Sequence, residues 1–447
     1  MDLDVLFLSR LQFALTIGFH FLFPPLSIGL AWLIVILEWR GWKRNDADSL
    51  RAGMFFGKIL GLTFAVGVAT GIVMEFQFGT NWAEYSKYVG DIFGAPLAAE
   101  AVFAFFLEST FLGLYLFGRD RVSKGVHWFS ALMVAVGATI SAFWIIVANS
   151  WQQTPAGYEI RNGRAELTDF AAAVFNPSTI ERFFHTFAAC LLAGAFLMAG
   201  ISAYLLLKNK AGDVARKTLK LATIFGFVVS VMTLFPTGHH HAVQVARSQP
   251  EKLAAIEGLI HGQANAPVVV FGIPSEDPPR LHYAIEIPGL LSMLASGDSD
   301  AEIPGIEDLR EAGRPTPPFV MTFVSFHMMV ALGNFFIAWT ALGVFLLIRK
   351  KLYDTRWYLK LLMWVIPLPL VACQLGWIVA EVGRQPWVVY RLLKTEDAFS
   401  ANVTGGEVLF SIVMFGLIYL ALGALYVFIL VRKIKQGPKP LAAKEAR

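Results

Sequence analysis

The sequence predicts an all-α integral membrane protein built from about nine transmembrane helices. Of its 447 residues, 56% are hydrophobic and only 16% are charged, and the mean hydropathy of +0.58 is well above that of water-soluble domains. Apolar runs such as 59–72 and 409–429 approach or exceed the roughly 20 residues that cross a bilayer core. Runs of this kind recur along the chain, so several spans are required.

Apolar windows separated by polar breaks give the position of each expected span. We interpret the whole chain, 1–447, as one membrane domain. No internal repeat is visible, so the inverted repeats of many transporters are not indicated. The windows predict spans at 11–37, 54–77, 94–117, 127–149, 183–206, 218–236, 318–348, 358–380 and 406–431.

The basic residues indicate the orientation in the membrane. They cluster in every second connection, and the connections between these are poorer in positive charge for their length. The positive-inside rule therefore predicts the N-terminus outside and the C-terminus inside, as an odd number of spans requires. This topology also explains the net charge of +4 without a nucleic-acid partner. The basic clusters are Arg40, Lys43 and Arg44; Arg119, Arg121 and Lys124; Lys208, Lys210 and Arg216; Arg349, Lys350 and Lys351; Arg432, Lys433 and Lys435.

The longest connection, 236–317, separates the sixth and seventh spans on the predicted outer side. Polar loops of about 80 residues are usually functional or disordered. Three consecutive histidines, 239–241, invite a metal-site hypothesis. Consecutive residues cannot direct three rings to one face of a helix or strand, so we expect the triplet to be a loop feature.

Histidines inside or beside the spans are the first candidates for chemistry. His20 lies within the first span and His185 at the outer start of the fifth. Imidazole is a common axial ligand of heme iron, although a histidine hydrogen-bonded to a neighbouring helix is an equal alternative for each. In the seventh span, Met328 and Met329 follow His327. A thioether with an imidazole makes a low-spin heme pair, but methionine in an apolar helix more often only packs.

Two carboxylates lie in the third span. Glu100 and Glu108 are eight positions apart, about 12 Å along a helix and within one broad face. A carboxylate buried in the membrane is costly unless it is protonated or used, so such groups serve in proton relays. A local hydrogen bond near the interface would account for Glu100, whereas Glu108, among phenylalanines, favours a functional role.

The end of the eighth span carries the densest motif, Gly376-Trp-Ile-Val-Ala-Glu-Val-Gly-Arg-Gln-Pro-Trp387. Trp377, Glu381 and Arg384 fall at i, i+4 and i+7, on one helical face, and Pro386 is expected to end or kink the helix. The glutamate and the arginine could form a plain ion pair, or they could hold heme groups.

Motifs along essentially the whole chain resemble subunit I of the cytochrome bd family of bacterial terminal oxidases. Together they are highly specific, and the resemblance implies a heme-bearing quinol:oxygen oxidoreductase of the bacterial cytoplasmic membrane. The motifs are Ser9-Arg-Leu-Gln-Phe-Ala-Leu, Met74-Glu-Phe-Gln-Phe-Gly-Thr-Asn-Trp82, Phe105-Phe-Leu-Glu-Ser-Thr, Trp144-Ile-Ile-Val-Ala-Asn-Ser-Trp151, Lys252-Leu-Ala-Ala-Ile-Glu257 and Gly383-Arg-Gln-Pro-Trp387.

The resemblance also implies axial ligands for three hemes. His185 and Met329 resemble the ligands of a low-spin heme b that takes electrons from quinol. His20 and Glu381 resemble the ligands of a high-spin heme b and a heme d, and which of them holds which heme is left open.

Four further residues match functional segments of the family. Lys252 and Glu257 match the quinol-oxidation segment of the outer loop. Glu100 and Glu108 match the proton-conducting carboxylates. The implied reaction oxidises ubiquinol or menaquinol outside and reduces oxygen to water with protons from the cytoplasm, which separates charge without a pump.

Two departures resemble the cyanide-insensitive branch of the family. The loop is of the short form, and His327 stands where many members carry arginine. In that branch heme d can be scarce or replaced by a further heme b, so the oxygen-binding heme is left open. Trp377 and Arg384 match residues that pack near the hemes. The family also implies a second membrane subunit, with or without a small single-span subunit.

Two rival functions remain. A proton-coupled transporter would use Glu100, Glu108 and Glu381 to bind protons or cations, with the histidines as packing groups. A non-catalytic heme-bearing anchor would only pass electrons. The heme content of the purified protein separates the three hypotheses.

Overall fold

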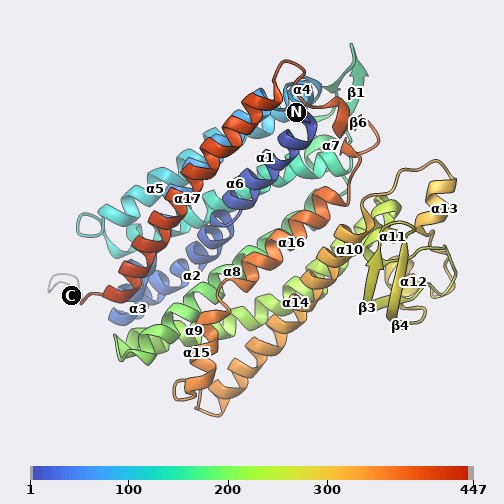
Figure 1. Cartoon of the computed structure of the whole chain (residues 1–447). Helices are drawn as coiled ribbons and strands as arrows, with labels where there is room; N and C mark the ends of the chain where they lie inside the picture. The colour runs from blue at the N-terminus through green and yellow to red at the C-terminus, as the bar shows by residue number, and fades with distance from the viewer. Residues whose placement is uncertain (1–3, 441–447) are drawn as a thin grey trace.

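The computed structural model describes residues 4–440, and within them nine helical segments are long and apolar enough to cross a membrane. This agrees with the predicted all-α fold. Figure 1 shows the spans as one elongated bundle, with the two termini at opposite ends. The segments are Val5–Lys43, Ala47–Thr80, Ala83–Phe117, Lys124–Gln153, Thr179–Leu207, Gly212–Ser248, Phe319–Ile348, Arg356–Val382 and Gly405–Gln436.

Five spans are single uninterrupted helices close to the predicted windows. They differ from the predictions mainly by extending beyond the apolar core, because polar residues at helix ends still form helix outside the hydrocarbon. Asp46, Ser123 and Thr404 cap three of them with side-chain hydrogen bonds to the first turn. These helices are α3 (Ala47–Thr80), α6 (Lys124–Gln153), α8 (Thr179–Leu207), α14 (Phe319–Ile348) and α17 (Gly405–Gln436).

The first and eighth spans are each interrupted. The first consists of α1 (Val5–His20) and α2 (Phe23–Lys43), and two prolines at the start of α2 follow the break. The eighth consists of α15 (Arg356–Trp364) and α16 (Leu368–Val382), separated near Pro367. Proline cannot supply the N–H that would continue a helix through these points. Both breaks lie within membrane-length segments, where an unsatisfied backbone needs other partners.

Two further spans contain π-helical turns. The third runs from α4 (Ala83–Ala99) through η1 (Glu100–Phe105) into α5 (Phe106–Phe117). The sixth runs from α9 (Gly212–Met232) through η2 (Thr233–Gly238) into α10 (His239–Ser248). Proline occurs at Pro96 and Pro236, next to or inside these turns. Such turns often occur at functional sites, and here one contains Glu100.

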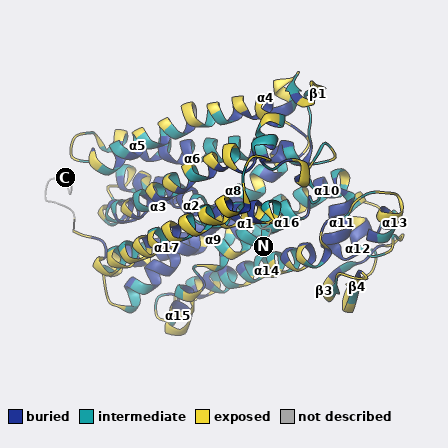
Figure 2. Ribbon diagram, turned by 45° about the horizontal axis from the view of Figure 1, so that its top comes forward, coloured by how far each residue is buried: buried dark blue, intermediate teal, exposed yellow. Residues whose placement is uncertain are grey.

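The core of the bundle lies around α2 and α8. In the fifth span, 78% of the most apolar window is buried, against 11% for α17, so α8 is central and α17 lies at the periphery, as the burial colours of Figure 2 show. Gly29 of α2 and Gly194 of α8 face each other so closely that a Cβ on either would overlap the other helix. Small residues allow this close crossing of membrane helices.

The two ends of the bundle differ in composition. The end that carries the predicted basic clusters, which lie in the last turns of α2, α5, α8, α14 and α17 or directly after them, is called the basic side. The opposite end carries the connections after α3, α6, α10 and α16 and is called the loop side. The arrangement fits the predicted alternation of charge, and the assignment of the loop side to the outside remains a prediction from the positive-inside rule.

The long connection is an ordered structure with its own small cores. It begins after Ser248, because α10 extends the sixth span beyond Pro236, where the sequence predicted the loop to start. It contains α11 (Pro250–Glu257), β3 (Val268–Ser275), β4 (Arg280–Ile287), α12 (Leu290–Ser296) and α13 (Ile306–Glu311). Strands β3 and β4 form an antiparallel hairpin. Buried residues of the loop pack against Phe319 and Phe323 of α14, so the loop is fixed to the seventh span (Figure 1).

Smaller elements complete the loop side. An antiparallel hairpin of β1 (Tyr158–Arg161) and β2 (Arg164–Leu167) leads into the short helix α7 (Phe170–Val174). After α16, the strands β5 (Trp387–Val389) and β6 (Leu393–Lys394) pair and lead into η3 (Thr395–Asp397). The carbonyl of Gln152 accepts a hydrogen bond of 2.9 Å from the N–H of Tyr390, which ties this segment to the end of α6.

Candidate heme and quinol site

A buried polar network on the loop side joins four helix ends. It is called the loop-side network and combines residues that are more than 200 positions apart. Its members come from the end of α6, the start of α8, the loop helix α11 and the end of α16. They are Asn149, Gln152, Gln153, Arg182, Lys252, Glu381 and Arg384.

Glu381 lies at the centre of one half of this network. Its Oε1 accepts a hydrogen bond of 2.8 Å from Asn149, and its Oε2 forms an ion pair of 2.5 Å with Arg384. The predicted helical face is only partly correct, because α16 ends at Val382 and Arg384 lies in the turn that follows. The side chain of Arg384 returns to Glu381 and also donates to Gln152 at 3.2 Å. The plain ion pair is therefore present, and Asn149 donates a second hydrogen bond to the same carboxylate.

Arg182 joins the same half from the first turn of α8. Its Nη2 donates to Oδ1 of Asn149, and the side chain is buried. Its Nε is also buried and has no hydrogen-bond partner among residues 4–440. Sequence reasoning missed both Arg182 and Asn149, since one lay just before a predicted span and the other at the end of one. Only the fold brings them to Glu381.

Lys252 carries the other half of the network into the loop. It is 2% exposed, and its Nζ donates to Oε1 of Gln153 at 2.7 Å and to the carbonyl of Ala380 at 3.3 Å. Burial, together with the positive charges of Arg182 and Arg384, holds the pKa of Lys252 well below its usual value, although Glu381 opposes this. Its amine therefore gives up a proton readily and can also accept one.

Glu257 ends the same loop helix. Its carboxyl is buried, and Oε2 has no hydrogen-bond partner in the described part of the chain. Burial raises the pKa of Glu257 to about 7. Such a carboxyl can exchange a proton near neutral pH, as a group that accepts a proton from quinol must.

Glu251, next to Lys252, anchors the loop helix instead. Burial opposes its ionisation, but hydrogen bonds from Tyr390, Arg314 and Arg391 outweigh this and lower the pKa of Glu251. The tyrosine bond is 2.6 Å and the closest arginine contact is 2.7 Å. A cleft of about 320 Å³ opens beside this cluster. These contacts anchor the start of α11 to the segments that carry Arg314 and Tyr390.

His185 and Met329 lie on helices that both pack against η2 and α16. The Nδ1 of His185 is buried, with no hydrogen-bond partner among the described residues, and its ring lies beside Gly238 of η2. Met329 points at α16, and its Sδ lies 3.0 Å from where a Cβ on Gly376 would be. Met328, in contrast, is 50% exposed. The direction of the side chains therefore favours Met329 over Met328 as a ligand.

His20 lies at the break between α1 and α2. Its Nδ1 is 2.9 Å from the hydroxyl of Thr70, and its ring approaches Gly71 of α3. The neighbouring Phe21 contacts Trp377 of α16, with ring centroids 5.7 Å apart. Trp377 and Gly376 are adjacent in α16, so this helix separates the His20 region from the Met329 region and contacts both.

The carboxylates of the third span lie near a third acidic residue. Ser141 of α6 donates a hydrogen bond of 2.6 Å to Glu100, which begins η1. Glu108 is buried against Gly137 of α6, and the charges of Glu100 and Glu108 interact. The charge of Glu75 in α3 also acts near Glu100. Glu75 lies in one of the motifs that resemble the family, but the sequence alone did not indicate a role for it.

The prediction for the histidine triplet was wrong. Residues 239–241 form the first turn of α10 and continue the sixth span. The ring of His241 lies 5.4 Å from that of His185, centroid to centroid, whereas His239 and His240 are exposed. The error came from taking Pro236 as the end of the helix, since a π turn carries the helix past the proline.

His327 fastens the loop to α14. Its Nε2 lies 2.9 Å from the carbonyl oxygen of Val269 in β3, and its Nδ1 lies 3.0 Å from that of Phe323. The ring also stacks on Phe323 at 3.9 Å. It therefore connects the hairpin of the loop to the helix that carries Met329.

The residues at the loop side fit a bound anionic cofactor such as heme. Arg182, Lys252 and Arg384 surround the carboxylate of Glu381, and their charges act on one another, so an anionic group here would relieve the repulsion. Arg182 and His185 both carry buried nitrogen atoms without a partner in residues 4–440. Heme supplies carboxylates for the cations and iron for imidazole, thioether and carboxylate ligands.

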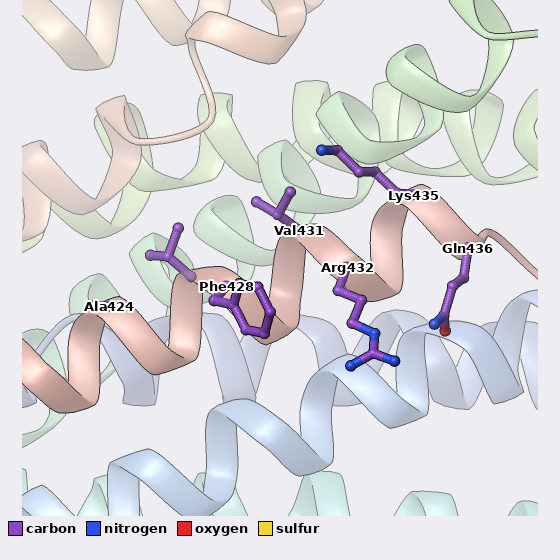
Figure 3. Close-up of a pocket in the computed structure, with 7 residues that line it drawn as sticks. Ala424, Phe428, Val431, Arg432, Lys435 and Gln436 are labelled. Atoms are coloured by element: carbon purple, nitrogen blue, oxygen red, sulfur yellow. The ribbon is translucent and has the colours of Figure 1, made fainter.

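A groove at the basic side does not belong to this site. It has a volume of about 640 Å³ and lies on the peripheral helix α17, where Figure 3 shows an apolar wall followed by polar side chains toward the end of the helix. Its lining is Ala424, Val427, Phe428, Val431, Arg432, Lys435 and Gln436. Long cationic side chains at such a helix end commonly reach toward the membrane surface.

Fold and site together define a multi-pass membrane protein with a buried polar network of charged side chains. Residues 8–438 match the family described as Cytochrome bd terminal oxidase subunit I. The chain therefore belongs to the cytochrome bd oxidase subunit I family, and it is a subunit of a bd-type terminal quinol oxidase in a bacterial membrane. Membership of this family implies heme cofactors and a complex of several subunits.

Named relatives cover almost the whole chain. It is 42% identical over 440 residues to cytochrome bd ubiquinol oxidase subunit 1 of Bacillus subtilis (strain 168), covering 97% of this chain and 94% of the relative. It is 36% identical to cytochrome bd-II ubiquinol oxidase subunit 1 of Escherichia coli (strain K12), covering 99% and 98%. The structure of bd oxidase from Geobacillus thermodenitrificans aligns with a TM-score of 0.91 at 32% identity, covering 98% of this chain and 100% of that one.

Proposed function

We propose that the chain is the catalytic subunit that oxidises quinol at the loop side and reduces oxygen to water at hemes within its bundle. In this proposal the loop side faces outside and the basic side faces the cytoplasm. The observation that carries the proposal is the position of Lys252. It belongs to the segment that matches quinol oxidation in the family, and it donates to the carbonyl of Ala380, the residue before Glu381.

The proposed heme ligands follow from the family and fit the directions of the side chains. His185 and Met329 would hold a low-spin heme b, and His20 and Glu381 would hold a high-spin heme b and a heme d, or a further heme b in its place. Bound there, the hemes would accept electrons one at a time and supply the iron at which oxygen is reduced. Trp377, which contacts Phe21, would pack between the two regions.

Two residues of α11 would handle the protons of quinol. Glu257, whose pKa burial raises to about 7, would accept one proton and release it to the outer side. Lys252, whose pKa burial and neighbouring cations lower, would bind a quinol oxygen by a hydrogen bond or take the second proton. Both act from one short helix that Glu251 holds in place.

Protons for oxygen reduction would come from the cytoplasm through the third span. Glu108 is buried and lies nearer than Glu100 to the basic end of the third span, and its charge interacts with that of Glu100. The path would take protons past Glu108 toward Glu100 and the oxygen-reducing heme. Because protons leave outside and are consumed from inside, charge would be separated across the membrane without a pump.

The proposal includes partners that the chain itself does not contain. They are a second membrane subunit, with or without a small single-span subunit, and the lipid bilayer. Quinol and oxygen would be the substrates, with ubiquinol and menaquinol as the two classes to compare. The test is oxygen uptake by the purified complex in vesicles, driven by each quinol, with a voltage-sensitive dye present.

The expected result is quinol-dependent oxygen uptake together with a membrane potential, negative on the basic side. Oxygen uptake without a potential would contradict the proposed proton route but not the oxidase reaction. Heme-containing complex that fails to consume oxygen with either quinol would contradict the proposed catalytic role.

A further inference from the structure

The π turn η2 sets the direction of His241. Proline has no N–H, so Pro236 cannot donate to the carbonyl of Met232 as an α-helix would require. The hydroxyl of Thr237 donates to that carbonyl instead, at 3.0 Å. The extra residue of a π turn rotates everything after it by about 100° relative to an uninterrupted α-helix.

The rotation separates the three histidines by environment. His239 and His240 are exposed, while the ring of His241 turns inward toward α8. There it lies 5.4 Å from the ring of His185, with the planes inclined by 50°. One member of the triplet is therefore placed beside the proposed heme ligand and two are not.

The Nε2 of His241 has no assigned partner in the part of the chain that the structure describes. It is buried, with no hydrogen-bond partner among residues 4–440. A buried polar atom left unpaired is unfavourable by about 1–3 kcal/mol, so such atoms usually face a ligand or water. A sequence position that only filled space here would favour leucine or phenylalanine.

The surroundings of this nitrogen indicate the chemistry of its partner. The charges of Arg182 and Lys252 act on His241, and the Nε of Arg182 is likewise buried without a partner in the described chain. The unpaired nitrogen of Arg182 and the buried amine of Lys252 thus both lie within electrostatic range of His241. Nitrogen donors of this kind bind carboxylate oxygens through charge-assisted hydrogen bonds.

We propose that His241, through its Nε2–H, donates a hydrogen bond to a carboxylate of the heme held by His185, and that Arg182 is the second donor to this carboxylate. The inference rests on the proposed ligation of a low-spin heme by His185. In this role His241 is a positioning residue for the heme and tunes its reduction potential, because a carboxylate that loses a donor keeps more negative charge near the iron. Extra negative charge stabilises the ferric form.

The test is a redox titration of the low-spin heme in the purified complex, with the heme content measured in each variant. His241→Leu should retain the heme and shift its ferrous-to-ferric ratio at a given potential about tenfold toward ferric, which is a potential about 59 mV lower. His241→Gln keeps a donor and should recover most of the shift. The matched control His240→Leu, at the exposed neighbour, should leave the potential unchanged.

Electron paramagnetic resonance separates a contact with the carboxylate from a contact with His185. The proposal expects the low-spin signal to keep its g-values in His241→Leu, since the axial ligands do not change. Altered g-values would overturn the assignment in favour of a bond to His185. An unchanged potential with full heme content would also overturn it, and a raised KM for quinol alongside would indicate a quinol contact instead.

A further readout covers the case in which His241→Leu does not accumulate. Resonance Raman spectra of His241→Phe, which keeps an aromatic ring but has no donor, should then show a shifted carboxylate-linked bending band of the low-spin heme, and an unshifted band would overturn the proposal. Failure of the proposed heme ligation by His185 can be distinguished from failure of the proposal for His241. A parent complex without a low-spin heme contradicts the proposed ligation by His185 before any variant is compared.

Discussion

The buried amine of Lys252 donates a hydrogen bond of 2.7 Å to Oε1 of Gln153, and this bond joins the loop helix α11 to the end of α6. The same amide donates to the carbonyl of Ala380 at 3.1 Å and accepts from Gln249 at 3.1 Å. A single side chain, that of Gln153, therefore fixes α11 relative to α16, the helix that carries Glu381. In the proposed function, this contact would keep the quinol at a fixed distance from the low-spin heme that it reduces.

Gln153→Leu is expected to slow the reduction of heme by quinol by about tenfold or more. The variant leaves the amine of Lys252 buried without its closest acceptor. An unpaired buried polar group is unfavourable by about 1–3 kcal/mol, and a charged one by more. Stopped-flow reduction by quinol measures the effect, while reduction by dithionite should be unchanged. Gln244→Leu is the control, because the amide of Gln244 bonds to Ser248 within α10. Equal quinol kinetics in the two variants would contradict the role of Gln153.

Met329→Leu is expected to remove one axial ligand of the low-spin heme b and leave the other hemes bound. Leucine keeps the volume but cannot coordinate iron. Quinol-driven turnover should fall to background, and the absorption of the low-spin heme should change. Met328→Leu is the matched control, because Met328 is 50% exposed. If Met328→Leu changed the low-spin spectrum and Met329→Leu did not, the ligand would be misassigned.

Quinol oxidation is expected to rise as the pH passes through about 7. Burial raises the pKa of Glu257 to about 7, so the carboxyl holds its proton below that pH and can accept one only above it. Glu257→Gln should lower the rate by about 10²-fold and remove this pH step, with every heme still reducible by dithionite. The control Glu302→Gln changes an exposed carboxylate of the same loop. A pH profile that is the same in the parent and Glu257→Gln would exclude Glu257 as the acceptor.

Most of the fold could be predicted because apolar length alone defines a membrane span. The seventh span was expected at 318–348 and is Phe319–Ile348. The break between α1 and α2 was not predicted, since the apolar run continues across Phe21 and Leu22 with no polar interruption. Hydropathy measures the cost of transfer into lipid and does not register where backbone hydrogen bonds fail.

The site could be predicted in its ionisable residues and not in their partners. Glu381, Lys252 and Glu108 stood out because charge within or beside a span is costly. Asn149 is a neutral residue at a helix end, and its contact with Glu381 spans 232 positions. His241 was missed because its direction depends on a π turn, which has no pattern in the sequence beyond Pro236.

Glu108→Gln is expected to lower the rate of oxygen consumption by about 10²-fold. The rate at which the membrane potential forms should fall with it. Glutamine keeps the shape and the hydrogen bonding of the buried side chain but cannot cycle a proton. Reduction of the low-spin heme by quinol should survive, because that step lies on the loop side. Heme content must be measured in the same preparation, since loss of a heme would imitate a blocked proton path. A Glu108→Gln enzyme with full heme content that turns over at the parent rate would contradict the role of Glu108 as a proton carrier.

The central claim, a catalytic heme-bearing subunit, is tested most directly by the dithionite-reduced absorption spectrum of the purified protein, combined with extraction of its pigments. The account predicts the bands of a low-spin heme b together with those of further hemes, and an extract that contains heme b with or without heme d. A spectrum without heme bands would contradict it and favour a proton-coupled transporter. A single low-spin heme would contradict it as well and would favour an anchor that only passes electrons.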